Sequence, residues 1–165
     1  LLRIKDMYLE ELLRQEQNRR DRIRWCRYYE NDQFTADQRA KLAARGQSAV
    51  SYNAIKPVID WLKGTERRGR IDFTVAPRRD DKQARESAQA KQELMKWLDY
   101  TNQTGFERSL ATDQAFITGL GWLEVAVRQD KQGPKVVAVA EDWRNIVHDS
   151  RAINRDGDDA RFLFR

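Results

Sequence analysis

Apolar side chains recur every three or four positions through most of the first 120 residues, which is the spacing of one face of an α-helix. This pattern predicts helical regions over residues 1–65 and 80–119. Within the first region, the run "RQEQNRRDR", residues 14–22, contains no apolar side chain. We therefore expect a helix with an apolar beginning and a solvated middle.

Local signals place several helix ends. Thr35 with Gln38, and Thr104 with Glu107, have the spacing of capping boxes, in which each side chain satisfies an exposed backbone group. Proline is tolerated in the first turn of a helix, so the helix that contains "IKPVID" is expected to begin near Ile55.

The last quarter of the chain changes to a period of two. Leu123, Val125 and Val127 point to one face of an expected strand, and the residues between them point to the other. The segment "DKQGP" is typical of a turn, and "KVVAVA" is typical of the returning strand of a hairpin. Residues 121–165 therefore predict a β-hairpin followed by further strands.

Three shorter segments also have strand character. Residues 143–147 and 161–165 predict the two further strands, and residues 71–76 alternate until a proline ends the pattern. Helices come first and most strands last, which favours an α+β fold over an alternating parallel one. We expect N-terminal helices followed by a small, mainly antiparallel sheet.

Composition excludes several classes of protein. Charged residues make up 35% of the 165 residues and apolar residues 40%, with five tryptophans, which is typical of a folded chain. No stretch approaches the roughly 18 apolar residues of a membrane span. The length suits one domain or part of one. Because the chain begins without methionine and stops within an alternating segment, we expect it to be a fragment of a longer protein.

Residue types that carry catalysis or bind metals are sparse. The single histidine, His148, lacks a partner nucleophile, and with the single cysteine, Cys26, it cannot form a zinc site. The acidic segment "INRDGDDA" fails the register of a calcium loop, and no phosphate-binding loop is present. We expect no enzyme activity, no cofactor and no bound metal. A metal-dependent hydrolase that uses Asp156, Asp158 and Asp159 is a third hypothesis.

The whole chain has a formal net charge of +5, and the excess of basic side chains lies in its first half. Five of them surround the strand expected at residues 71–76: Arg67, Arg68, Arg70, Arg78 and Arg79. These arginines either finish a helix in solvent or contact another subunit, or they contact phosphates directly. No base-reading motif is present, so any nucleic-acid binding here is expected to be directed to the backbone and sensitive to salt.

The tryptophans Trp61, Trp97 and Trp122 are open to more than one interpretation. Large aromatic side chains more often anchor a core or an interface than they serve as stacking platforms for bases. The sequence alone leaves the choice between core and interface open.

Three stretches, taken together and in order, resemble the portal proteins of tailed bacteriophages, particularly those of short-tailed phages and related prophages. The first is "RWCRYYENDQFTADQRAKLAARGQSAVSYNAIKPVIDWLKGTERRGRIDF". The second is "GFERSLATDQAFITGLGWLEVAV", and the third is "DSRAINRDGDDARFLFR". Together they cover most of the chain.

The resemblance implies a subunit of a dodecameric ring at one capsid vertex, in the α+β body that is often called the wing. The implied partners are other copies of the chain, the terminase, head and tail proteins, and the double-stranded DNA that passes through the ring. The implied location is the virion, and the host cytoplasm during assembly. Portal proteins are not enzymes, since the packaging ATPase is the separate large terminase subunit. Portal chains are also several times longer than this one. The alternative function is a stand-alone basic module that binds the nucleic-acid backbone.

Overall fold

The computed structural model describes residues 2–69, 74–131, 133–154 and 158–165. The helices and strands, in chain order, are α1 (Leu2–Arg14), α2 (Glu16–Tyr29), α3 (Ala36–Ala44), α4 (Ile55–Arg68), α5 (Lys82–Asn102), α6 (Thr104–Thr118), β1 (Trp122–Asp130), β2 (Gly133–Glu141), the 3-10 helix η1 (Trp143–Asn145), β3 (Val147–His148) and β4 (Leu163–Phe164). Helices followed by small antiparallel sheets confirm the expected α+β fold.

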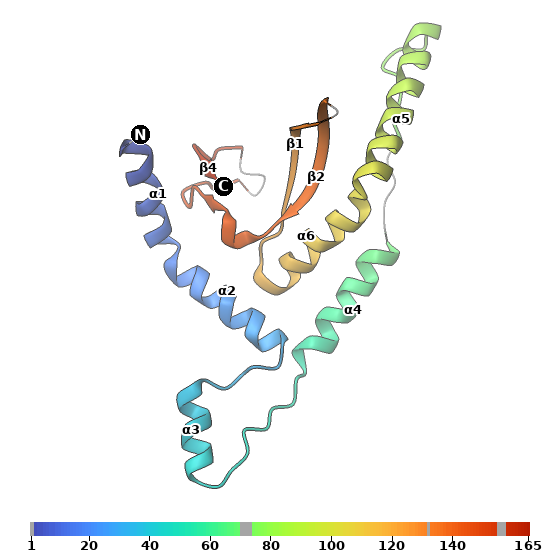
Figure 1. The fold of residues 1–165 in the computed structure, drawn as a ribbon. Coiled ribbons are helices and arrows are strands. Elements are labelled where there is room, and N and C mark those ends of the chain that lie inside the picture. The colour runs from blue at the N-terminus through green and yellow to red at the C-terminus, as the bar shows by residue number, and fades with distance from the viewer. Residues whose placement is uncertain (1, 70–73, 132, 155–157) are drawn as a thin grey trace.

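The elements form an open arrangement with two sides (Figure 1). Helices α1 and α2 make one side, α4 and α5 make the other, and α3 lies at the far end between them. The β1–β2 hairpin stands between the two sides, and α6 lies at its foot. Helix α6 is the hub, because α2, α4, α5 and both hairpin strands pack against it.

Two glycines let the chain turn from α6 into β1. Gly119 ends the helix with a positive φ of 77°, a conformation that glycine adopts without steric cost. Gly121 passes so close to α6 that an added Cβ would lie 2.0 Å from the Ala111 carbonyl oxygen. The start of the hairpin is therefore held directly against the hub helix.

The strand predictions are confirmed in part. The β1–β2 hairpin pairs from Trp122 with Glu141 to Asp130 with Gly133, as the alternation predicted. The segment 143–147 was expected to be a strand, but it begins as a 3-10 turn because the Asp142 side chain accepts a hydrogen bond from Arg144 N–H. Within this segment the strand β3 begins only at Val147, and its two residues, Val147 and His148, pair with β4.

The strand expected at residues 71–76 is not confirmed. Residues 71–73 lie outside the described part of the chain, and the described residues 74–76 are not assigned to a strand. Their backbone is instead held by α5, since Gln92 Oε1 accepts a hydrogen bond from Val75 N–H at 2.6 Å.

One of the two predicted capping boxes is wrong. Thr35 and Gln38 cap α3 reciprocally, as expected. Thr104 does not cap α6, because a single residue, Gln103 in the left-handed conformation (φ 50°), separates α5 from α6 and leaves Thr104 inside the helix. The Glu107 carboxylate is used elsewhere: its Oε2 accepts a hydrogen bond from Ala140 N–H of β2 at 2.7 Å.

The buried apolar core is small for a chain of this length. Among the described residues it consists of Ala88, Ala111, Ala138, Trp143, Ile146 and Val147. The accessible surface is 12985 Å², whereas a compact monomer of 19.5 kDa exposes about 8,500 Å². The chain therefore presents about 4,500 Å² more surface than a compact monomer does. Of the helices in the described ranges, none has the length and apolar character to cross a bilayer.

Candidate subunit and nucleic-acid interface

Three polar side chains join α1 and α2 to the segment that follows the hairpin. Glu11, Gln15 and Arg19 are spaced four residues apart and therefore lie on one helical face. Gln15 Nε2 donates to the His148 carbonyl oxygen at 2.6 Å, and Arg19 donates to the carbonyl oxygens of Arg144 (2.6 Å) and Ile146 (3.2 Å). We call this contact between residues 11–19 and 144–150 the polar seam.

Glu11 holds the other end of the polar seam. Its Oε1 accepts hydrogen bonds from Ser150 N–H at 3.0 Å and from Gln15 Nε2 at 3.1 Å. Glu11 is 4% exposed and Gln15 is 2% exposed. Burial raises the pKa of the Glu11 carboxyl, but the hydrogen bonds from Ser150 and Gln15 outweigh it, so the pKa lies below its ordinary value. The charged carboxylate is therefore the form that the seam stabilises.

The same segment contains a second buried carboxylate. Asp149 is 2% exposed and accepts hydrogen bonds from Arg161 Nε and from Arg151 N–H, both at 3.0 Å. The hydrogen bond from Arg161, followed by that from Arg151, lowers the pKa of the Asp149 carboxyl. This ion pair closes the loop between β3 and β4.

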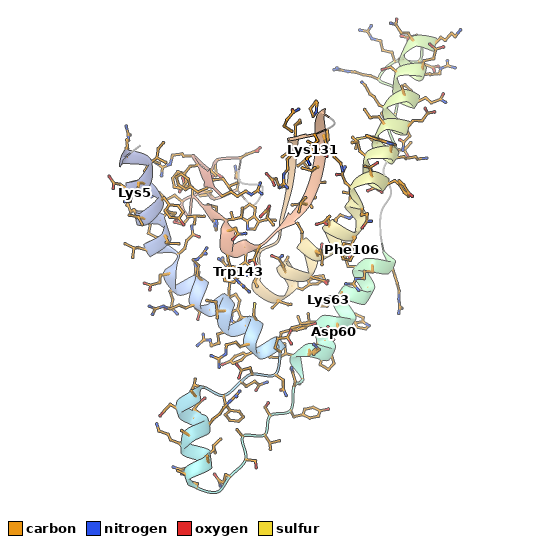
Figure 2. The ribbon with its side chains drawn as sticks, viewed as in Figure 1. Lys5, Asp60, Lys63, Phe106, Lys131 and Trp143 are labelled. Carbon is orange, nitrogen blue, oxygen red and sulfur yellow. The ribbon has the colours of Figure 1, made fainter. Side chains whose placement is uncertain are left out.

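The expectation that residues 14–22 form a solvated stretch of helix is confirmed for most of these residues but is wrong for the face that carries Gln15 and Arg19. Besides Gln15 and Arg19, the guanidinium of Arg22 lies 5.8 Å from the ring centroid of Trp143, on the same ring that Arg19 approaches at 5.5 Å. Figure 2 shows Trp143 between α2 and the foot of the hairpin. Polar residues are buried here because their partners are backbone carbonyls of a distant segment, which hydropathy does not reveal. The spacing of Glu11, Gln15 and Arg19 was the available signal.

The five arginines of the sequence analysis do not act as one cluster. Arg67 Nη2 pairs with Asp113 Oδ2 of α6 at 3.0 Å, and Lys63 lies 3.8 Å from the same oxygen. Arg68, Arg78 and Arg79 are exposed, and their side chains form no ion pair or hydrogen bond with another described residue. Arg70 lies outside the described residues.

Arg67 therefore serves first to fasten α4 to α6, together with a hydrogen bond from the Ser109 hydroxyl to Glu66 at 3.1 Å. The basic end of α4 also matches the negative pole of the helix dipole. Among the described members of the five, Arg68, Arg78 and Arg79 are the unpaired arginines open to a phosphate or to a neighbouring protein.

A tyrosine joins α2 to α4. The Tyr29 hydroxyl donates to Asp60 Oδ1 at 2.6 Å and accepts from Lys63 Nζ at 3.1 Å. The ammonium groups of Lys56 and Lys63 both lie 4.4 Å from the centroid of its ring. Burial, with the hydrogen bond to Asp60, raises the pKa of the Tyr29 hydroxyl. Asp60 and Lys63 lie on the part of α4 that faces the end of α2 (Figure 2).

The outer faces of α4 and α5 carry large apolar side chains in solvent. On α4 these are Ile55, Val58 and Trp61, and on α5 they are Leu94, Trp97 and Tyr100. We call these two sets the α4 stripe and the α5 stripe. Trp61 is 69% exposed and Trp97 is 57% exposed, so neither is a core residue of the subunit. Trp122 is half-buried beside His148, with ring centroids 5.8 Å apart.

Candidate catalytic and metal-binding residues are used structurally. The described residues contain no group of three or more histidine, cysteine, aspartate or glutamate side chains placed to hold a metal ion. Asp159 accepts hydrogen bonds from the backbone N–H groups of Ile153 (2.7 Å) and Asn154 (3.1 Å), and Asp156 lies outside the described residues. Burial, followed by the charge of Arg22, lowers the pKa of His148. Burial raises the pKa of the Cys26 thiol, which makes it less reactive.

Comparison with known families gives one match, to the model of the phage P22-like portal protein, over residues 5–165. The chain belongs to this family. The resemblance noted in the three sequence stretches is thereby confirmed. No curated protein matches the sequence.

Membership of the P22-like portal family assigns the chain a structural role in a phage portal. This assignment bears on the α4 stripe and the α5 stripe. Portal subunits act as part of an oligomer, so a subunit with exposed tryptophans and a small core of its own is the expected kind of building block.

Proposed function

We propose that this chain forms part of the body of a portal ring at one vertex of a phage capsid. In this proposal, double-stranded DNA enters and leaves the head through the ring, and the tail attaches to it. The terminase, which hydrolyses ATP, and the head and tail proteins are its partners. The protein assembles in the host cytoplasm and is retained in the virion. The family match over residues 5–165 carries the proposal.

The geometry supports a mechanical role without catalysis. The polar seam joins residues more than 120 positions apart through hydrogen bonds of 2.6–3.2 Å, and the ion pair of Arg67 with Asp113 fastens α4 to the hub helix. These contacts fix the relative positions of the two sides of the subunit. A subunit held in this way can transmit the forces of DNA packaging to its neighbours without changing shape.

The test is to image the full-length protein by negative-stain electron microscopy and to count its subunits by native mass spectrometry. We expect closed rings with a central hole and a mass of about twelve subunits. A full-length protein that stays monomeric or dimeric at high concentration, and also in the presence of the phage scaffold and coat proteins, would contradict the proposal.

One observation favours the alternative function of backbone-directed nucleic-acid binding. Arg68, Arg78 and Arg79 are exposed and have no acidic partner among the described residues. If they bind phosphates, affinity for duplex DNA falls steeply with salt, and neutralising all three reduces the slope of that dependence by about three. Replacement of Arg20, Arg24 and Arg39, which already pair with Glu16, Asp21 and Asp32, is the matched control.

A further inference from the structure

The α4 stripe and the α5 stripe have the same construction. In each, three large apolar side chains follow one another at steps of three residues, which forms a ridge along the helix: Ile55, Val58 and Trp61 on α4, and Leu94, Trp97 and Tyr100 on α5. All six side chains are at least 42% exposed. Each stripe contains one tryptophan, a residue type that is enriched at the centres of interfaces.

Val58 and Trp61 of the α4 stripe and all three residues of the α5 stripe are exposed in the described chain, whereas Ile55 also borders a cavity lined by Tyr29 and Phe116. Helix α4 turns the face opposite Trp61 to α6, through the contacts of Glu66 with Ser109 and of Lys63 and Arg67 with Asp113. Helix α5 also packs on α6, and its buried residue is Ala88, four positions before the hydrogen-bonded Gln92. The two tryptophan-containing ridges therefore face outward from two helices that both pack on α6.

The exposed area identifies the kind of partner. The chain shows about 4,500 Å² more surface than a compact monomer of its mass. Obligate interfaces between subunits bury about 2,000–5,000 Å² in total, counted over both partners. In a closed ring each subunit contributes one face to each of two contacts. The surface that it buries in total therefore equals the area of one whole interface. The excess surface has the size that a second copy of the chain on each side would cover.

Ring closure further requires that the two faces differ. A heterologous contact joins one surface of a subunit to a different surface of the next, whereas a surface that pairs with itself stops at a dimer. We propose that the α4 stripe of one copy packs against the α5 stripe of the next copy. This inference rests on the proposed function, since it names the surfaces through which the ring subunits meet.

The test uses two variants of the full-length protein, Trp61→Asp and Trp97→Asp. Each carries one damaged and one intact stripe, so each alone is expected to lose the ring and to weaken association about 30-fold or more. Mixed in equal amounts, they have one functional contact between them, from the intact α4 stripe of Trp97→Asp to the intact α5 stripe of Trp61→Asp. The expected product is a heterodimer that grows no further, seen by native mass spectrometry.

The control is Leu13→Asp, which places the same charge on an exposed position of α1 (71% exposed) and is expected to leave the ring intact. Far-UV circular dichroism and the unfolding midpoint of each variant check that the subunit still folds. If either tryptophan variant fails to fold, Val58→Asp and Leu94→Asp replace the pair, since these positions are 58% and 54% exposed.

The outcomes separate the two proposals. If the wild-type protein forms no ring, alone or with the phage scaffold and coat proteins, the proposed function fails. If the wild type forms rings but both variants still do so, only the pairing of the two stripes is overturned. Monomeric variants that give no heterodimer on mixing also overturn the pairing, as does a loss of the ring in Leu13→Asp. A heterodimer from the mixture, with neither variant assembling alone, supports it.

Discussion

The polar seam and the α4 stripe reverse the usual distribution of side chains between interior and surface. In the seam, Glu11 and Gln15 are almost fully buried, whereas on α4 Trp61 is mostly exposed. The Glu11 carboxylate and the Gln15 Nε2 group are hydrogen-bonded to a distant backbone segment, which offsets the cost of burying them. The exposed apolar groups have no described partner. The contrast indicates that polar contacts hold the subunit together while apolar surface is reserved for another molecule.

Acidification is expected to have the largest effect on this contrast, because it acts on both buried carboxylates of the seam region at once. The pKa values of Glu11 and Asp149 are lowered in the folded protein, so their stabilisation is present above the unfolded value of about 4 and is lost as the pH falls through the folded values. Thermal unfolding of the dissociated full-length protein between pH 7 and pH 3 measures this. The temperature midpoint of unfolding should decrease as the pH is lowered below about 4. In Glu11→Gln this decrease should be smaller.

Removal of the Glu11 carboxylate is expected to cost the most of any single substitution in the seam. Glu11→Ala leaves the Ser150 N–H and one N–H of the Gln15 side-chain amide without their acceptor in a part-buried site, which lowers the free energy of unfolding by about 2–4 kcal/mol. Chemical denaturation measures the change. Glu10→Ala is the control, since Glu10 is exposed and pairs only with Arg14, and a change within about 0.5 kcal/mol is expected there. Equal effects of the two substitutions would contradict the importance of the seam.

Truncation of Arg19 should have a smaller effect. Arg19→Ala removes two hydrogen bonds to the carbonyl oxygens of Arg144 and Ile146 and the contact with the Trp143 ring, at a cost of about 1–2 kcal/mol. The neighbouring Arg20 pairs only with Glu16 and points to solvent, so Arg20→Ala should change stability by less than about 0.5 kcal/mol. Denaturation curves of the two variants side by side give the comparison.

The smallest effect on subunit stability is expected for the stripes. Trp61 and Trp97 are mostly exposed in the subunit, so replacing either by aspartate should change the free energy of unfolding of the dissociated protein by less than about 1 kcal/mol. A loss of several kcal/mol would show that another part of the same chain covers these residues.

The sequence predicted the parts of the fold that depend on local signals. The cap formed by Thr35 and Gln38, the start of α4 at Ile55 and the β1–β2 hairpin all follow from residues close together in the chain. Glu107 was assigned wrongly because its carboxylate binds Ala140 of a strand formed 33 residues later, and no local pattern reports such a partner.

The candidate site was harder to predict for the same reason. A polar run such as residues 14–22 is expected on a solvated helix, and equally on a helix whose side chains bind backbone carbonyl groups of another segment. Only the tertiary structure separates these two cases. Trp61 and Trp97 fitted a core or an interface equally well from sequence, and their exposure in the subunit decides against the core. The arginines were recognised as a group, yet the pairing of Arg67 with Asp113 depends on the packing of α4 on α6.

The most direct test of the contrast between the two regions is hydroxyl-radical footprinting of the tryptophans in the full-length protein, before and after assembly. Trp143 lies beside the polar seam, under Arg19, and is 4% exposed in the subunit, so it should be protected in both states. Trp61 and Trp97 should be oxidised readily in the dissociated protein and should become protected in the ring. Equal oxidation of Trp61 and Trp97 in the two states would contradict the account.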